Sequence, residues 1–434
     1  MMTAISSISA ALEALDASGL NCTTQLLGPS AMAEAQALDA AGRQGALFGV
    51  PFVVKANVAV KGALHDGASP ALQGNIANAD AGIVARLRAA GAVPVALANM
   101  HELAFGITSH NAQYGTVKNP ANPAHMTGGS SGGTAAAVAS SAVPAGIASD
   151  TGGSGRLPAA FCGCVGLRPT SGRYPDDGIL TLSHTLDTLT VMGADVDMVA
   201  RLDAVITGEG ALPSVARPKL GVLRNPFWQG VDRDMARCGD HVLERIAAAG
   251  AVLLERDVPE IETLTEACGF PIALTETKEN WTRFAQSIRG QSLADFAEEI
   301  ASVDVKELYR MMARGDIPPR ETYDTAMSTH RPGLQTLLAQ TFDEMGVDAL
   351  IFPTLAKAAP QIGATEEVEI NGATLPFFPT FTRRELVASV AGLPAISVPC
   401  GTDADGLPVG MELVGRAGTD RTLLSLAQWV VKAL

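Results

Sequence analysis

The segment GGSSGGTAAAVASSAV at residues 128–143, continued by PAGIASDTGGSG at 144–155, decides which kind of fold this chain adopts. Residues 134–143 carry no charge, and a helix that is apolar on every side is one buried inside the protein. Pro144 ends this helix, and AGIASD at 145–150 predicts a strand that leads into a second glycine-rich turn. A buried helix followed directly by a buried strand predicts an α/β protein, in which helices cover a sheet.

A strand–helix–strand pattern lies upstream of this segment. ALFGVPFVV at 46–54 predicts a buried strand that ends at Lys55. Asp80 is placed to cap a helix with one apolar face, Gly91 to end that helix, and residues 92–98 to form the next strand. This βαβ rhythm predicts a large, mostly parallel mixed sheet with helices on both faces.

The rest of the chain extends this pattern without a clear linker. Residues 3–42 are rich in alanine and predict helical structure with interruptions near Gly19 and Pro29. Residues 200–345 are the most charged part and predict a helical elaboration that shapes a pocket. We therefore expect a single domain over residues 1–434. Three more strands and a closing helix are expected at 348–353, 394–399, 409–415 and 420–433.

The composition excludes several classes of protein. The 434 residues carry a formal net charge of −14, and an acidic surface does not match a phosphate backbone or an anionic membrane. The chain has no run of about 18 apolar residues that would predict a membrane-spanning helix. Its first residues also lack the basic and then apolar pattern of a secretory signal. We expect a cytoplasmic protein that binds neither nucleic acid nor membranes.

The cysteines and histidines form no recognisable disulfide or metal pattern. The six cysteines are scattered, and only Cys162 and Cys164 are close, so we expect them to pack as small apolar residues. No H-x-x-x-H or H-E-x-x-H pair occurs among the seven histidines, which are His65, His101, His110, His125, His184, His241 and His330. The sequence therefore predicts no metal site and no cofactor.

Three residues are candidates for chemistry. Lys55 ends a buried strand, Ser130 lies in GGSSGG, and Ser154 lies in TGGSG, 24 residues after Ser130. The glycines beside each serine let a substrate approach the backbone closely and let successive N–H groups point at one spot, as an oxyanion requires. The helix after GGSSGG would direct its positive N-terminal end to the same place. The pattern therefore indicates a site that stabilises a developing oxyanion.

Two other interpretations of GGSSGG remain open at this point. A phosphate-binding loop would need G-x-x-x-x-G-K-[ST], or G-x-G-x-x-G after a strand with an acid about 20 residues on, and neither is present. The G-x-S-x-G turn of α/β-hydrolases matches residues 128–132 literally. That fold needs a catalytic histidine late in the chain, whereas the last histidine here is His330, with 104 residues still to come.

Residues 46–190 resemble the amidase signature family. The similar segments are VPFVVKANVAVKG, GIVARLRAAGAVPVALANMHELAFG, YGTVKNPANP, GGSSGGTAAAVAS and SDTGGSGRLPAAFCGCVGLRPTSGR, and AGLPAISVPCGTDADGLPVGMELVG is similar to the closing sheet segment of the family. Within the family, SHTLDT at 183–188 and the C-terminal GLPVGMEL and GTDRTLL look like arylacetamide hydrolases of the mandelamide and indoleacetamide type. The resemblance implies the amidase signature fold, as one amidase domain over residues 1–434.

The resemblance also implies a Ser–cisSer–Lys triad. Ser154 would be the nucleophile, Ser130 would relay a proton next to an unusual cis peptide bond, and Lys55 would be the base. A serine hydroxyl is a weak nucleophile without a base, and a lysine can serve only if burial keeps it neutral, as the apolar LFGVPFVV favours. The oxyanion hole would consist of the backbone N–H groups of Thr151, Gly152, Gly153 and Ser154.

Other residues are expected to support this site. Ser131 would form a hydrogen bond or cap a helix, and Asp150 and Arg156 would fix the nucleophile loop, as would Asp187 in SHTLDT. Two positions differ from the family pattern. Ala56 stands where an Asp usually follows the lysine, and the strand VALANM lacks the usual Lys. Neither position belongs to the triad, but Ala56 leaves open which polar network surrounds Lys55.

These observations predict an amidohydrolase that converts a small carboxamide to a carboxylic acid and ammonia through a seryl acyl-enzyme, without a cofactor. Its partner would be the small-molecule amide, and a homodimer is a family-level expectation. The alternatives are a hydrolase of urea-like small amides, an amidotransferase-type subunit acting on charged tRNA, and a non-catalytic binding protein. Specificity-setting pocket residues are expected within 200–345 and around Ala104 to Gly106.

Overall fold

An 11-stranded sheet forms the centre of the computed structural model, which describes residues 3–42, 45–364 and 366–434. The strand order is β1-β3-β2-β4-β6-β5-β12-β13-β9-β7-β8. These strands are β1 (Thr23–Leu26), β2 (Pro51–Lys55), β3 (Val93–Ala98), β4 (Ala145–Asp150), β5 (Val165–Arg168), β6 (Thr188–Gly193), β7 (Lys219–Leu223), β8 (Val252–Arg256), β9 (Ala349–Pro353), β12 (Ala395–Thr402) and β13 (Pro408–Val414). Strands β10 (Glu367–Ile370) and β11 (Ala373–Pro376) form a separate hairpin.

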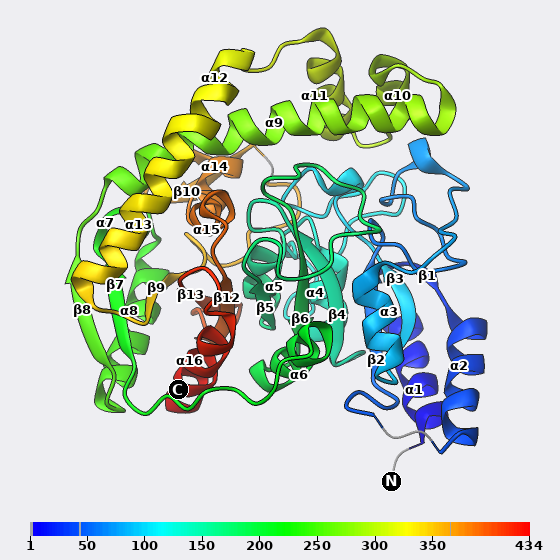
Figure 1. Ribbon diagram of the computed structural model, residues 1–434, viewed down its shortest axis with the longest axis horizontal. Helices are drawn as coiled ribbons and strands as arrows, with labels where there is room; N and C mark the ends of the chain where they lie inside the picture. Colours follow the sequence, from blue (N-terminus) through cyan, green and yellow to red (C-terminus); the bar gives the residue numbers. More distant parts are fainter. Residues whose placement is uncertain (1–2, 43–44, 365) are drawn as a thin grey trace.

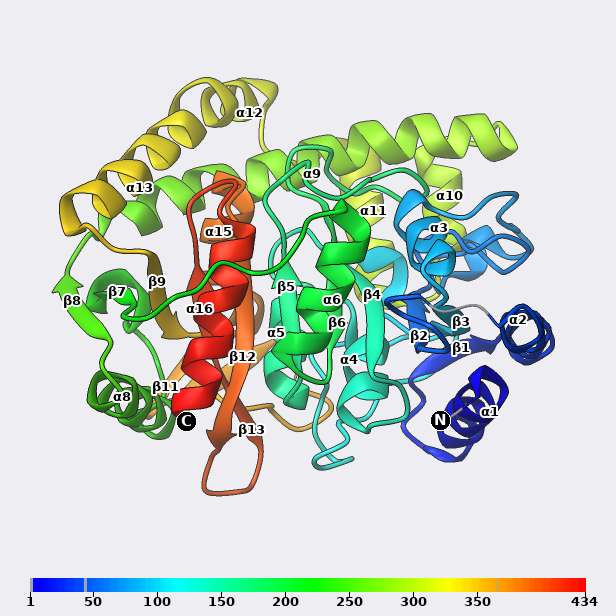
Figure 2. The ribbon, with the colours of Figure 1, turned by 60° about the horizontal axis from the view of Figure 1, so that its bottom comes forward.

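Helices cover this sheet on both sides (Figures 1 and 2). The α-helices are α1 (Ala4–Ala17), α2 (Gly28–Ala40), α3 (Gly82–Ala89), α4 (Gly132–Ala139), α5 (Arg156–Cys162), α6 (Val196–Thr207), α7 (Arg224–Phe227), α8 (Arg233–Ala248), α9 (Glu260–Arg289), α10 (Leu293–Glu299), α11 (Val303–Arg314), α12 (Arg320–Thr325), α13 (Arg331–Met345), α14 (Phe377–Thr382), α15 (Glu385–Ala391) and α16 (Asp420–Ala433). Short 3-10 turns lie at η1 (Pro70–Leu72) and η2 (Glu102–Ala104), and a π-helical turn lies at η3 (Ala326–His330).

The alternation of side chains along β2 shows how one strand serves two cores. Phe52 and Val54 belong to the core that also contains residues of α3, α6 and α16, whereas Val53 belongs to the core with residues of α1 and α4. Successive strand residues point to opposite faces of a sheet, so a strand buried on both faces is apolar throughout. The predicted α/β fold, with a large mixed sheet covered on both faces, is confirmed.

The predicted predominance of parallel pairs is wrong. Among the neighbouring strands of the described sheet, four pairs are parallel and six are antiparallel. The parallel pairs lie in two groups, β3-β2-β4 and β9-β7-β8, and an antiparallel block from β4 to β9 separates them. The βαβ rhythm of residues 46–98 was correct locally, but it does not hold for the strands that come from distant parts of the chain.

Three local predictions need correction. The half-exposed strand β1 interrupts the segment 3–42, which was predicted to be helical. The sequence did not reveal this strand, because TTQL is too short and too polar to show strand alternation. The strand predicted at 46–54 is confined to β2. Asp80 does not cap α3, whose N-cap residue is Ala81. The Asp80 carboxylate instead accepts hydrogen bonds from the Lys61 backbone N–H and from the Arg88 guanidinium.

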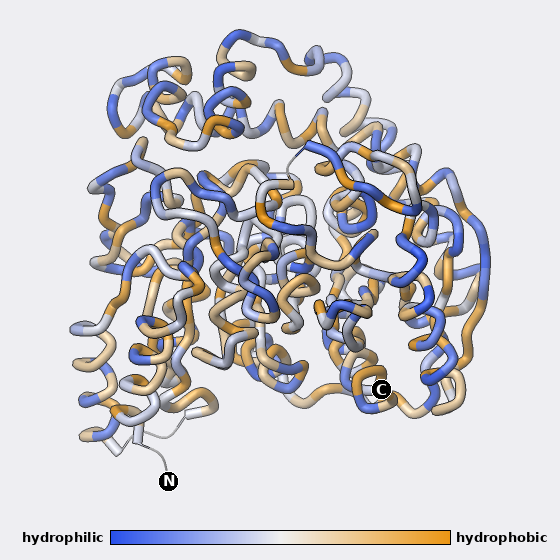
Figure 3. The backbone as a smooth tube through the Cα atoms, turned by 180° about the vertical axis from the view of Figure 1, so that it is seen from behind, coloured by the Kyte–Doolittle hydropathy of each residue, from blue (hydrophilic) through white to orange (hydrophobic). Residues whose placement is uncertain are grey.

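The region 200–345 is more than a helical elaboration. Its strands β7 and β8 extend the main sheet, while helices α9 to α13 run along one side of the molecule (Figure 1). Hydrophilic and hydrophobic residues mix along these helices, as expected for helices with one covered and one solvated face (Figure 3). Within the described part of the chain, no helix combines the length and apolar character needed to cross a bilayer.

The strand order determines where the candidate residues meet. β2 and β4 are parallel neighbours, so Lys55 and Asp150, which end them, lie at the same edge of the sheet. β6 is antiparallel to β4 and pairs Thr188 with Asp150, so the loop before β6 reaches this edge as well. Distant segments of the sequence thereby form one site.

Candidate active site

Lys55 lies at the centre of a buried network of hydroxyl groups. Its Nζ donates hydrogen bonds to Ser130 Oγ at 2.7 Å and to Ser149 Oγ at 2.8 Å, and Asn57 Nδ2 also contacts Ser149 Oγ, at 3.1 Å. Burial lowers the pKa of Lys55 from 10.5 to about 7, although the charges of Asp150 and Asp187 act in the opposite direction. A substantial neutral fraction near neutral pH is what a proton acceptor requires.

Ala56 explains part of this environment. Its side chain is buried in an apolar cluster together with Ala68 and Leu103. A carboxylate at this position would favour the charged form of the neighbouring lysine, whereas a methyl group leaves the burial of Lys55 uncompensated there. The departure from the family pattern is therefore consistent with a lysine that loses its proton easily.

Ser130 lies two residues before the first residue of the buried helix α4. The Gly129–Ser130 peptide bond is cis, as the resemblance implied. Gly133 allows the helix to approach the sheet, because an added Cβ would lie 2.2 Å from the carbonyl oxygen of Asn99. Ser131 is the N-cap residue of α4, but its side chain forms no capping hydrogen bond, and its Oγ instead donates to the Ser149 carbonyl at 3.2 Å. α4 thus holds the Ser130 hydroxyl against Lys55.

Ser154 follows β4 and lines a pocket that opens to solvent. The residue is buried, with 8% of its surface exposed. Among the hydrogen bonds of the described residues, none joins Ser154 to Ser130. Contacts of this kind are often long before a substrate is bound and tighten in the complex. Ser130 lies between Ser154 and Lys55 in the predicted relay, and the Ser130–Lys55 half of that relay is formed here.

The predicted oxyanion hole needs one correction. The Gly153 N–H donates to Asp150 Oδ1 at 2.9 Å and is therefore already used. Within the described chain, the N–H groups of Thr151, Gly152 and Ser154 donate to no protein acceptor. These three residues also line the pocket, whereas Gly153 does not. Unpaired N–H groups that face a cavity next to a nucleophile are suited to bind an oxyanion.

A buried ionic network holds the nucleophile loop in place. Asp150 accepts hydrogen bonds from the Gly153 and Gly155 N–H groups and from Arg156 and Arg168. Although burial opposes it, the two guanidiniums keep the pKa of Asp150 far below its usual range. Arg156 also donates to Glu412 of β13 at 2.6 Å. Asp150 and Arg156 therefore lie where loop-fixing residues were predicted, and not at the reacting centre.

Gly153 shows how little room this loop has. Its φ of +110° lies in the left-handed region, and an added Cβ would lie 2.7 Å from the Cβ of Glu385. Only glycine fits both demands without a shift of α15.

Asp187 anchors the other side of the loop. Its Oδ1 accepts a hydrogen bond from Thr151 Oγ1 at 2.7 Å, and its Oδ2 accepts from the N–H groups of Leu182 and Ser183. Burial raises the pKa of Asp187 to about 6, while these hydrogen bonds and Arg168 act to lower it. SHTLDT thus connects to the predicted oxyanion loop through a single carboxylate.

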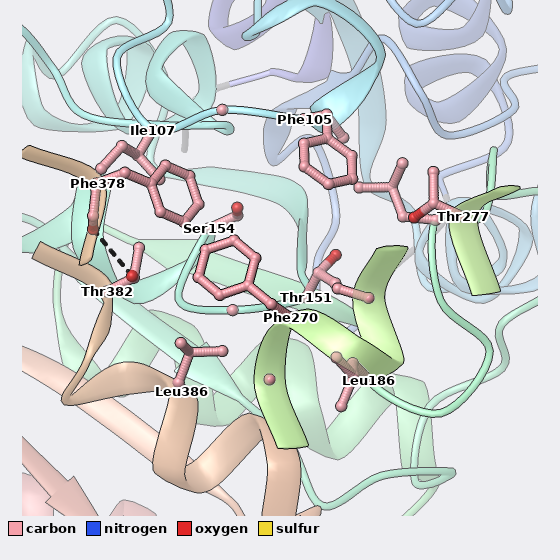
Figure 4. Close-up of a pocket in the computed structure, with 16 residues that line it drawn as sticks. Phe105, Ile107, Thr151, Ser154, Leu186, Phe270, Thr277, Phe378, Thr382 and Leu386 are labelled. Atoms are coloured by element: carbon pink, nitrogen blue, oxygen red, sulfur yellow. Dashed lines mark hydrogen bonds between the residues drawn. The ribbon is translucent and has the colours of Figure 1, made fainter. Parts of the chain in front are cut away.

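The pocket in front of Ser154 is small, with a cavity volume of about 70 Å³, and it opens to solvent. No charged side chain is among the described residues that line it, which are Ala104, Phe105, Gly106, Ile107, Thr151, Gly152, Ser154, Leu182, Leu186, Gly269, Phe270, Ala273, Thr277, Phe378, Thr382 and Leu386. Figure 4 shows the Ser154 hydroxyl among the rings of Phe105, Phe270 and Phe378. The predicted lining around Ala104–Gly106 and from 200–345 is present, but 182–186 and 378–386 also contribute.

Several residues of the site were missed by sequence reasoning. Ser149, Arg168 and Glu412 lie in the buried strands AGIASD, VGLR and PVGMELV. A polar or charged side chain in such a strand needs a partner, and this signal would have marked all three. Cys162 and Cys164 are buried, and burial raises the pKa of both thiols, in keeping with the predicted packing role. In the described residues, no cluster of His, Cys, Asp and Glu is arranged to hold a metal ion.

The chain is similar along nearly its whole length to proteins of one family. The family model described as Amidase matches residues 5–424. The indoleacetamide hydrolase of Agrobacterium vitis is 40% identical over 405 residues, which cover 92% of this chain and 87% of the relative. The mandelamide hydrolase of Pseudomonas putida is 32% identical, with 96% and 86% covered. The crystal structure of an amidase superposes with a TM-score of 0.90 at 31% identity, covering 100% of this chain and 96% of that chain.

Proposed function

The chain belongs to the amidase family and is an amide hydrolase, and we propose that its substrates are small primary amides with an uncharged, largely apolar acyl group. The observation that carries this proposal is the pocket beside Ser154, whose described lining contains three phenylalanines and no charged side chain. Apolar walls favour an aromatic or aliphatic acyl group, and a carboxylate or ammonium would lose its hydration without a partner. The names of the two curated relatives, indoleacetamide and mandelamide hydrolase, agree with an aryl-bearing acyl group.

The geometry supports a two-step reaction. Neutral Lys55 accepts a proton from Ser130 while Ser130 accepts one from Ser154, and the Ser154 oxygen attacks the amide carbon. The resulting oxyanion lies against the free N–H groups of the 151–154 loop. The C–N bond then breaks as the proton returns through Ser130 to the leaving nitrogen, which departs as ammonia. Water, deprotonated along the same route, hydrolyses the acyl-enzyme.

Two alternatives fit the pocket less well. A urea-like amide is small and polar, and it has no apolar group to place against the phenylalanines of the pocket. The glutamine side of an amidotransferase reaction would bring a charged ammonium and carboxylate into a cavity whose described lining offers no opposite charge.

The direct test is ammonia release from a panel of primary amides. Indoleacetamide, phenylacetamide and mandelamide are expected to give the highest kcat/KM, with urea and glutamine far below. Faster turnover of glutamine or urea than of every aryl amide would contradict the proposed substrate class. Activity is also expected to survive EDTA, because the proposed steps use side-chain and backbone groups alone. Loss of activity in EDTA, with recovery on adding zinc, would contradict the proposed mechanism.

We expect kcat/KM for amides to rise with pH and to reach a plateau above neutrality. Lys55 acts as a base only when neutral, and its neutral fraction rises as pH passes through its pKa of about 7. Asp187 has a pKa of about 6, so it becomes protonated below that pH. The protonated carboxyl group is a poorer acceptor for the hydrogen bonds from Thr151, Leu182 and Ser183. The measurement is kcat/KM as a function of pH, from acidic to mildly alkaline values. A flat profile across the neutral range would exclude Lys55 as the base.

A further inference from the structure

The 182–187 loop forms one wall of the acyl pocket, and it has little regular structure of its own. Leu182 and Leu186 line the pocket, and the loop leads directly into β6. Helix α9 supplies the adjacent wall through Gly269, Phe270, Ala273 and Thr277. The width of the pocket at this point therefore depends on how the loop is attached to α9.

Glu276 of α9 makes this attachment. Its Oε2 accepts hydrogen bonds from Ser183 Oγ at 2.5 Å and from the Thr185 N–H at 3.0 Å. Its Oε1 accepts from Thr185 Oγ1 at 2.6 Å and from Tyr323 OH of α12 at 3.0 Å. His184 Nε2 lies 3.2 Å from the same oxygen. Three consecutive residues of the loop thus contact one carboxylate, which is fully buried.

The placement of Glu276 excludes a direct role in the reaction. It is not part of the pocket lining, although its neighbour Thr277 and the preceding turn at Ala273 are. One turn further along α9, Asn280 Nδ2 donates to the Leu182 carbonyl at 3.0 Å. The same face of the helix therefore contacts residues 182–185 of the loop, between the two leucines that line the pocket.

The attachment continues to the oxyanion loop. Asp187 lies two residues after Thr185 and accepts the hydrogen bond of Thr151 Oγ1. Leu186 is fixed from the other side, where Arg168 donates to its carbonyl at 2.8 Å. A shift of the 182–187 loop would therefore move a pocket wall and disturb Thr151 at the same time.

We propose that Glu276 is a positioning residue that sets the width of the acyl pocket by holding the 182–187 loop on α9. The proposal rests on the proposed function for its kinetic readout. It assigns Glu276 to substrate selectivity, because a wall that moves affects a large acyl group more than a small one. Misplacement of pocket groups by about 1 Å can cost two orders of magnitude in rate.

The test compares phenylacetamide with acetamide in Glu276→Ala and Glu276→Gln. The ratio of their kcat/KM values is expected to fall about tenfold in Glu276→Ala, mainly through a higher KM for phenylacetamide. The drop should be smaller in Glu276→Gln, which keeps one acceptor. Glu279→Gln is the matched control on the same helix, since Glu279 forms a half-exposed ion pair with Arg320, and its ratio should stay within about twofold of wild type.

A role limited to stability predicts a different result. It would lower the amount of active enzyme, measured by titration with a serine-directed phosphonyl reagent, and leave the substrate ratio unchanged, which would overturn the proposal. Thr185→Val removes a single donor to Glu276 and keeps the size of the side chain, so it decides the matter if Glu276→Ala does not fold. Its ratio should shift in the same direction, about threefold.

Hydrogen exchange separates this proposal from the proposed function. The peptide that covers residues 182–187 should exchange faster in Glu276→Ala than in wild type or Glu279→Gln. If the wild-type protein hydrolyses no primary amide, the proposed function fails. Hydrogen exchange alone then tests whether Glu276 holds the 182–187 loop on α9. Unchanged exchange in folded Glu276→Ala would overturn the positioning role.

Discussion

Ser154→Ala is expected to lower amide turnover by about 100,000-fold while the fold is retained. The Ser154 hydroxyl forms no hydrogen bond within the described chain, so its removal leaves no buried partner unsatisfied. The free N–H groups of the loop remain, and they account for the residual rate. The measurements are ammonia release, the unfolding temperature, and mass spectrometry after treatment with a phosphonyl reagent.

Ser131→Ala is the matched control for this substitution. Its hydroxyl contacts the Ser149 carbonyl and not the pocket, so the loss of activity should be within about tenfold. The wild-type adduct is expected on Ser154 and should be missing in Ser154→Ala. An adduct on Ser130 in the wild-type protein would contradict the assignment and restore the G-x-S-x-G interpretation.

Lys55→Arg and Lys55→Ala are both expected to lose at least about 1,000-fold in amide hydrolysis. A guanidinium stays charged and cannot accept a proton, so arginine does not replace the proposed base. Lys55 forms no ion pair among the described residues, and its partners are the hydroxyls of Ser130 and Ser149. A purely structural lysine would predict the opposite, with arginine restoring much of the activity that alanine loses.

Lys55→Met separates the two explanations further, because it keeps length and removes charge in a fully buried place. Esters should suffer less than amides in all three variants, since an alkoxide leaves without the returned proton more readily than an amine does. Measuring a matched amide and ester pair, together with the unfolding temperature, tests this. Near-wild-type amide turnover by Lys55→Arg would reject the proposed base.

Local patterns predicted the strands and the helix that carry the candidate site. The apolar strand before Lys55, the uncharged helix after GGSSGG and the strand before TGGSG each appear in the sequence as a single continuous segment. Elements of this kind are determined by their own residues. The Ser130–Lys55 contact then follows once β2 and β4 pair side by side.

Pairings between distant segments were harder to foresee. The antiparallel block from β4 to β9 depends on which strands pair with each other. The residues of one strand do not specify which other strand will lie beside it. Glu276 looks like any acid on a charged helix, and only its contact with Ser183 and Thr185 distinguishes it. Strands β7 and β8 were also missed, because helical patterns dominate the region 200–345 in which they lie.

The bond between Arg156 and Glu412 has a consequence for the synthesis of this protein. The two residues are 256 positions apart, and both are fully buried. A nascent chain that already exposes Ser154 still lacks the carboxylate that completes the support of its nucleophile loop, because β13 comes last in the chain among the strands of the described sheet. Contacts between such distant segments also form late in folding. We therefore expect fragments that end before residue 412 to hydrolyse no amides, because their nucleophile loop lacks the Glu412 carboxylate.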